Sequence, residues 1–135
     1  MGNTLESDRR SAPVEDGMRP DMELKIIQEP IPHDQLIAMA RATHGDMVKI
    51  VVDIERGILA LGGEWHAEGE EALLEDGSKQ ANLWGANIYP DKAGDERIEY
   101  TSLINIRPKA GNRSMVVESS TIRQEMRKII DRLLL

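Results

Sequence analysis

The first apolar patterns along the chain predict a strand followed by a helix. A short apolar cluster indicates a strand over residues 23–28, which a Glu-Pro pair ends. Apolar residues at helical spacing then predict a helix over 33–43. Gly45 follows closely, and we expect it to end this helix in the left-handed conformation that glycine adopts without strain.

The next two apolar runs are joined by a Glu-Arg-Gly turn and predict a β-hairpin of residues 47–53 with 57–61. The first run is apolar at the consecutive positions 50–52, which face both sides of a strand. We therefore expect this strand in the centre of the sheet. Helical spacing returns over residues 67–75, and Gly77 ends that predicted helix.

A second hairpin is predicted from residues 83–89 and 98–107, which flank a polar loop. Burying the apolar residues of both strands on one side pairs position 88 with 98 and position 84 with 102. That register places Asn87, Asn105 and Arg107 together on the more polar face of the hairpin.

The last helix is predicted to begin at Ser119, Ser120 or Thr121, and Thr121 stands at capping-box spacing from Gln124. A strong apolar stripe continues to the end of the chain. The final leucines, 133–135, are more apolar than a free end requires. We expect them either to lie on the sheet or to form a dimer contact.

These elements predict a single α+β domain with the order β-α-β-β-α-β-β-α, a mostly antiparallel sheet and helices packed on one face. The domain is expected to span residues 22–135. Residues 1–21 mix Gly, Pro, Ser and charge without apolar periodicity, so we expect a disordered leader there.

Composition narrows the class of protein. A chain of 135 residues forms one core. It contains no Cys, which excludes disulfides, thiolate zinc sites and cysteine nucleophiles. No apolar run reaches the roughly 18–20 residues of a membrane helix, so we expect a soluble, cytoplasmic protein without a membrane partner.

Charge is unevenly distributed along the chain. Residues 1–100 hold 10 Lys and Arg against 21 Asp and Glu, whereas residues 101–135 hold 7 against 3, which gives −7 in total. The acidic balance argues against nucleic acid as a partner, because such binding depends on neutralising phosphates. The basic final third is compatible with a local anion site.

Glu64, His66 and Glu68 form the first candidate site, which we interpret as catalytic. His66 can act as a general base oriented by a carboxylate, or can bind a divalent metal together with the carboxylates. Alternatively, the carboxylates only stabilise the positive end of a helix. The spacing matches no metal motif, and we predict neither a metal nor a cofactor.

Trp84 and Asn87 form a second candidate, separated by Gly85 and Ala86. Trp84 either fills a core that is poor in rings, with Gly85 allowing close packing above it, or Gly85 lies under a ligand that Asn87 hydrogen-bonds.

The third candidate is the polar loop after the second hairpin, with Asn105, Arg107, Asn112, Arg113 and Ser114 as ligand-binding residues. Its two arginines and its glycine turn can form an anion-binding nest with guanidinium clamps. Alternatively, the arginines only pair with the acidic body of the protein.

Two strings, GGEWHAEGEEALLEDGSKQANLWGANIYP (62–90) and INIRPKAGNRS (104–114), resemble a family of short prokaryotic proteins known only as a domain of unknown function. The resemblance covers residues 24–135. It implies a stand-alone domain without a known activity, and therefore assigns no catalytic residue.

Three functions follow as hypotheses. The first is a domain that binds an anionic small molecule, with or without catalysis, between segment 64–71 and loop 105–114. The second is a protein-interaction module or homodimer that uses the sheet edge or the C-terminal helix. The third is an RNA-directed protein, against which the net charge of −7 and the few aromatic residues count.

Overall fold

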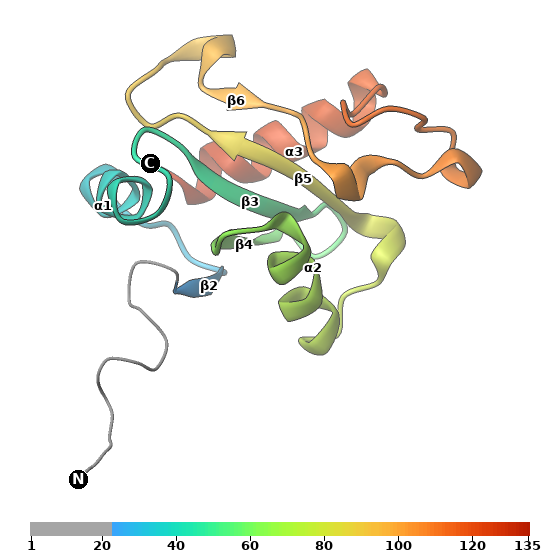
Figure 1. Cartoon of the computed structure of the whole chain (residues 1–135), viewed down its shortest axis with the longest axis horizontal. Coiled ribbons are helices and arrows are strands. Elements are labelled where there is room, and N and C mark those ends of the chain that lie inside the picture. Colours follow the sequence, from blue (N-terminus) through green and yellow to red (C-terminus); the bar gives the residue numbers. More distant parts are fainter. Residues whose placement is uncertain (1–22) are drawn as a thin grey trace, which may run out of the picture.

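The computed structural model describes residues 23–135 of the chain. This part contains three α-helices and a five-stranded antiparallel sheet (Figure 1), which confirms the predicted α+β class and element order. The strands are β2 (Leu24–Ile27), β3 (Val48–Asp53), β4 (Ile58–Gly62), β5 (Leu83–Ile88) and β6 (Ile98–Glu99), and the helices are α1 (His33–Thr43), α2 (His66–Glu75) and α3 (Ser120–Leu133). The leader predicted over 1–21 lies outside the described residues.

Strand β3 occupies the centre of the sheet, as predicted. The strand order is β2-β4-β3-β5-β6, and neighbouring strands are antiparallel. Successive residues of β3 face opposite sides, so Ile50 and Val52 pack in the larger apolar core and Val51 packs in a smaller one. Because both faces of β3 are apolar, the sheet requires cover on both sides.

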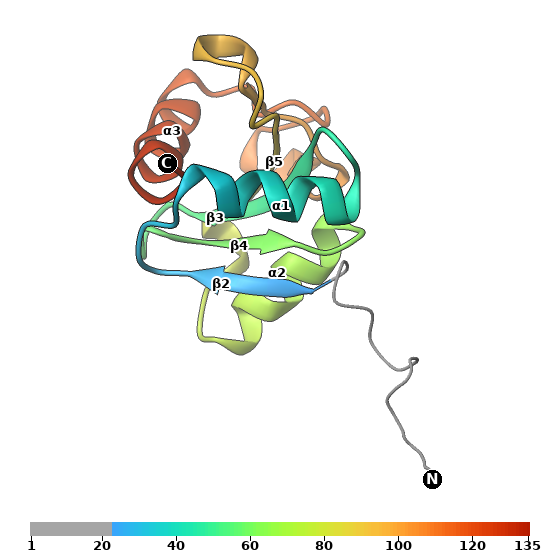
Figure 2. The ribbon, with the colours of Figure 1, turned by 90° about the vertical axis from the view of Figure 1, so that its left-hand side faces the viewer.

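The helices divide between the two faces, so the expectation that they share one face was wrong. Leu36 of α1 and Met126 of α3 belong to the larger core, whereas Leu73 of α2 packs with Val51 in the smaller one. Gly69 brings α2 close to the sheet, because a Cβ there would lie 3.0 Å from Val51 Cγ2. Figure 1 shows α3 behind β5, and Figure 2 shows α1 lying lengthwise over β3 and β4.

Strand β6 is much shorter than the strand predicted over 98–107. The predicted pair of Ile88 with Ile98 is confirmed, but the pair of 84 with 102 is wrong. After Glu99 the chain leaves the sheet edge and crosses the face of β5, where Ser102 lies over Gly85. A Cβ on Gly85 would lie only 2.6 Å from Ser102 Cβ, so the interpretation of Gly85 as a site of close packing is confirmed.

The C-terminal leucines complete the core. Leu133 and Leu134 are buried among the residues of the larger cluster, whereas Leu135 is exposed. The backbone N–H of Ile31 donates to the Leu133 carbonyl at 2.9 Å, and that of Leu135 donates to the Ile31 carbonyl at 3.2 Å. Of the two alternatives, leucines 133 and 134 therefore pack inside the protein and are not available for a dimer contact.

Helix α3 begins after Ser119, one of the three predicted starts. The Ser119 Oγ accepts a hydrogen bond from the Ile122 N–H at 3.2 Å, which identifies Ser119 as the N-cap. The capping box expected between Thr121 and Gln124 does not form, because both residues already lie inside the helix.

We expect Gly85→Ala to destabilise the fold by about 1–3 kcal/mol, because the new methyl group overlaps Ser102. Urea unfolding measures this change. Adding Ser102→Gly removes the atoms that collide, so the double variant should be more stable than the sum of the two single losses predicts. Strictly additive losses would contradict the contact.

Candidate functional site

A side chain in the first turn of α2 forms hydrogen bonds with the backbone just before the helix. The Glu68 carboxylate accepts hydrogen bonds from the backbone N–H groups of Glu64, at 2.8 Å, and Trp65, at 2.9 Å. This contact orders the chain at the helix entrance in the manner of a capping box. Glu68 therefore has a structural partner on the chain itself, whereas Glu64 lies exposed at the surface.

His66 is the first residue of α2 and lies half buried against β5. Its Nε2 is 2.8 Å from the Ala86 carbonyl oxygen, so in the neutral ring Nε2 carries the proton and Nδ1 keeps a lone pair. Burial lowers the pKa of His66, the hydrogen bond to Ala86 and the nearby Asn87 side chain oppose this effect, and the charge of Lys49 reinforces it. The ring is therefore neutral at pH 7 and can accept a proton.

A row of polar side chains crosses the sheet beside His66. Lys49 on β3, Asn87 on β5 and Glu99 on β6 occupy neighbouring register positions on the face that α2 covers. Asn87 is 7% exposed, and its Nδ2 donates to Glu99 Oε1 at 2.9 Å. By distance and angle its buried Oδ1 has no hydrogen-bond partner in residues 23–135, although the side chain lies close enough to His66 to raise the pKa of that ring. Leaving a buried acceptor unpaired costs about 1–3 kcal/mol, so a donor that reached this atom would be favoured.

Lys49, His66 and Asn87 line a pocket of about 390 Å³ at the amino end of α2. Trp65 and His66 form one wall, and the segment 101–104 that crosses β5 forms the other. Trp65 is 62% exposed and Leu103 is 71% exposed, and together with Met115 they form an apolar rim. The pocket thus combines His66 of the first predicted site with Asn87 of the second.

Asn105 and Asn112 hold the segment that follows β6 in place. Asn105 Oδ1 accepts from the Gly85 N–H at 2.9 Å, and its Nδ2 donates to the Gly85 carbonyl at 3.0 Å. Asn112 Nδ2 donates to the Asn105 carbonyl at 2.8 Å, and its Oδ1 accepts from the Glu118 N–H at 2.8 Å. Both side chains are buried, and neither lines the pocket.

The turn at Arg113 and Ser114 binds an anion that the chain itself provides. The backbone N–H groups of both residues donate to the Glu118 carboxylate, each at 3.1 Å. The Ser114 hydroxyl donates to the Val116 carbonyl at 3.2 Å, and Arg113 is exposed. The predicted nest therefore exists as a turn geometry, and an internal carboxylate occupies it.

Trp84 and Arg107 stack on each other, with the guanidinium 4.7 Å from the ring centroid. Trp84 is buried in the larger core, as the structural interpretation of this residue predicted. Arg107 donates to the Leu83 carbonyl and lies 3.6 Å from the Glu70 carboxylate. Burial lowers the pKa of Arg107, and Glu70 opposes that shift. Segment 64–71 and the 105–114 loop therefore meet through this ion pair, not across the pocket.

Lys49, Ser102, Leu103 and Met115 line the pocket but were not among the predicted site residues. Lys49 could have been recognised from the sequence, because it is a charged residue between apolar residues of a predicted central strand. The other three reach the pocket only because the chain crosses β5 after β6, which no local pattern indicates.

Within residues 23–135, no three His, Asp or Glu side chains lie close enough to hold a metal ion. None of the described helices combines the length and the apolar character needed to cross a membrane. The fold and site thus define a small α+β domain whose pocket carries an amine, a neutral imidazole and an amide.

The chain belongs to the family described as "Protein of unknown function (DUF5674)", which it matches over residues 25–133. The predicted resemblance to a family of unknown function is thereby confirmed. No curated protein matches the chain. No solved structure matches it either. Function must therefore be argued from the pocket itself.

We expect the free energy of unfolding to depend on pH through His66. Because folding lowers the pKa of this ring, the unfolded chain binds a proton more readily than the folded chain does. Stability is therefore lost as the pH falls below about 6.5, the ordinary histidine pKa, and the loss levels off below the folded pKa. Urea unfolding at several pH values should show a smaller dependence for His66→Gln than for the wild type.

Ring-nitrogen NMR provides the direct check, because the titration midpoint of His66 should lie below that of a free histidine. Equal pH dependence in the wild type and in His66→Gln would contradict the buried, neutral state of the ring.

Proposed function

We propose that this protein binds a small molecule with an apolar body and an anionic head group in the pocket at the amino end of α2. The observation that supports the proposal is the buried Oδ1 of Asn87, which has no partner in residues 23–135 and belongs to a residue lining the pocket. The volume of about 390 Å³ lies within the roughly 300–1,000 Å³ of small-molecule sites. The sequence predicted a site between segment 64–71 and loop 105–114. The proposed pocket keeps the first of these segments, but its other wall is residues 101–104.

The polar groups of the pocket specify the head group. Lys49 supplies a positive charge that attracts an anionic oxygen. Asn87 Oδ1 and His66 Nδ1 are acceptors, so they require a hydroxyl or N–H group on the ligand. A carboxylic acid with a hydroxyl or an amide N–H on the neighbouring carbon carries both features.

The rim residues specify the body of the ligand. Trp65, Leu103 and Met115 expose apolar surface, and Ile104 continues it toward the sheet. Covering apolar surface stabilises a complex by about 25 cal/mol per Å². The flexible methionine side chain adapts to ligands of different shape.

The same groups are suited to proton transfer. A neutral His66 can take a proton from a ligand atom, and the charge of Lys49 stabilises the negative charge that then develops. Glu64 and Glu68, which the sequence suggested as partners of His66, are left out of this role. Glu68 already accepts two backbone hydrogen bonds, and Glu64 does not line the pocket.

Anilinonaphthalenesulfonate, an aromatic anion that fluoresces in apolar surroundings, provides a probe for this pocket. We expect Lys49→Gln to weaken its binding about tenfold, because a charged contact is lost. Lys128→Gln removes an exposed charge from α3 and should leave the affinity unchanged. Hexanoate should displace the probe and hexylamine should not. Equal affinities of the two lysine variants, or equal displacement by the amine, would refute the proposal.

The apolar rim also favours a second function, self-association of two copies through Trp65, Leu103 and Met115. Exposed apolar residues that line one pocket form a continuous surface, and such surfaces mark contact sites when they are large enough. This candidate retains the predicted homodimer but transfers its contact from the C-terminal leucines to the rim.

Sedimentation velocity over a range of protein concentrations tests this second function. If two copies associate through the rim, Leu103→Glu should yield a monomer, whereas Leu74→Glu should not, because Leu74 is exposed near the other end of α2. A wild-type protein that is monomeric at all concentrations rules out self-association and leaves ligand binding untouched.

A further inference from the structure

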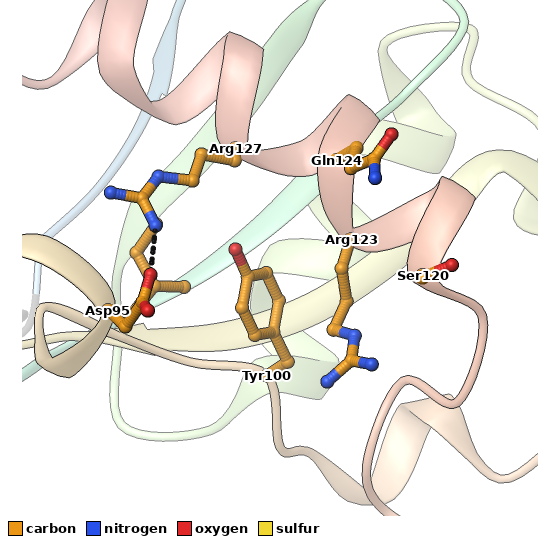
Figure 3. A pocket seen from close by; sticks show the side chains of 7 residues that line it. Asp95, Tyr100, Ser120, Arg123, Gln124 and Arg127 are labelled. Carbon is orange, nitrogen blue, oxygen red and sulfur yellow. Dashed lines mark hydrogen bonds and ion pairs between the residues drawn. The ribbon is translucent and has the colours of Figure 1, made fainter.

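A polar groove lies between α3 and the segment that contains β6. Its volume is about 470 Å³, and it lies beside the larger core, on the sheet face opposite α2. Ile98 contributes to its apolar base. The polar side chains around it are Asp95, Tyr100, Ser120, Arg123, Gln124 and Arg127 (Figure 3).

Four of these residues form one stripe along α3. Ser120, Arg123, Gln124 and Arg127 recur at i, i+3, i+4 and i+7, so they share a face of the helix. The two arginines are one turn apart, which is about 6 Å along the axis. Two of the basic residues of this helix thus line the groove.

The two arginines differ in how they are neutralised. Arg127 donates to Asp95 Oδ1 at 2.8 Å and to Asp131 Oδ2 at 3.4 Å. Arg123 has no acidic side chain within 4 Å among residues 23–135, and its guanidinium lies 5.9 Å from the Tyr100 ring centroid. Figure 3 shows Tyr100 between the two arginines. Within residues 23–135, Arg123 therefore forms no ion pair, although the Asp95 carboxylate lines the same groove.

Most polar groups that surround the groove can donate hydrogen bonds. Burial raises the pKa of Tyr100, and Arg127 and Arg123 only partly oppose that shift, so the phenol keeps its proton at neutral pH. The Ser120 hydroxyl, the Gln124 amide and the two guanidiniums add further donors. A tetrahedral dianion with several acceptor oxygens matches this set better than a carboxylate, which carries one charge and two oxygens.

We propose that this groove is a binding site for a phosphoryl group, either inorganic phosphate or a phosphomonoester. Arg123 makes the main charged contact, and Ser120, on the same face of α3, is the neighbouring hydroxyl donor, whereas the Tyr100 hydroxyl points toward Arg127 (Figure 3). When no anion is bound, the Asp95 carboxylate forms an ion pair with the Arg127 guanidinium. Because the Asp95 side chain is fully exposed, this ion pair is weak, and an incoming phosphate can replace it.

Titration of the full-length, ¹⁵N-labelled protein with sodium phosphate at constant ionic strength tests the proposal. Amide shifts should concentrate at residues 95–100 and 120–127. Arg123→Gln should weaken binding about tenfold or more, since it removes the charged contact. Arg123→Lys retains the charge but loses the planar fork of the guanidinium. Its affinity for phosphate should therefore lie between those of the wild type and Arg123→Gln.

Asp95→Asn distinguishes a ligand site from a structural ion pair. It removes the competing carboxylate, so phosphate should bind several-fold tighter to this variant than to the wild type. Lys128→Gln, on the same helix but outside the groove, is the matched charge control and should bind as the wild type does.

Three results would overturn the proposal: no localised shifts with phosphate, equal shifts with chloride, or equal losses in Arg123→Gln and Lys128→Gln. Lys49→Gln should not affect phosphate binding, because Lys49 lies in the other pocket. The proposal for the groove and the proposal for the pocket can therefore be refuted independently of each other.

Discussion

The two hydrogen bonds between the Asn105 side chain and the Gly85 backbone hold the segment that carries one wall of the pocket. Strand β6 ends after two residues, so the edge of β5 at Gly85 would otherwise be left without a partner. The Asn105 amide pairs with both the N–H and the carbonyl of Gly85, and its Nδ2 also donates to the Met115 carbonyl at 3.0 Å. Each buried group left unpaired would cost about 1–3 kcal/mol. One side chain thus fixes the crossing of β5 and the position of Met115.

Cover on both faces of the sheet creates two separate environments for charged groups. The pocket lies on the α2 face, beside Lys49 and His66, and the groove lies on the α3 face, beside Arg123. Neither Lys49 nor Arg123 has an acidic partner within 4 Å among residues 23–135. Most Lys and Arg of residues 23–135 likewise form no ion pair, so what distinguishes Lys49 and Arg123 is that each lines a hollow. This placement of Lys49 and Arg123 is the basis of the two proposed anion sites.

The candidate site could be predicted only in part. The amino end of α2 was recognised from Glu64, His66 and Glu68, and Asn87 was recognised as a residue that could hydrogen-bond a ligand lying over Gly85. The asparagines and arginines of the later loop gave a similar signal in the sequence. In the structure, Asn105 and Asn112 satisfy backbone groups, and Arg107 bridges the loop to α2. A polar side chain looks the same in sequence whether its partner is a ligand or the chain itself.

The sequence by itself determined the local elements. Helix α1 begins and ends at the predicted residues, and both strands of the first hairpin agree within one residue, because apolar periodicity and glycine turns act over a few neighbouring positions. Tertiary structure alone decided that α2 covers the opposite face and that residues 101–104 cross β5. Both outcomes depend on close approach between distant residues, at Gly69 against Val51 and at Gly85 against Ser102. A missing Cβ permits such contacts, but the sequence does not state which partner will fill the space.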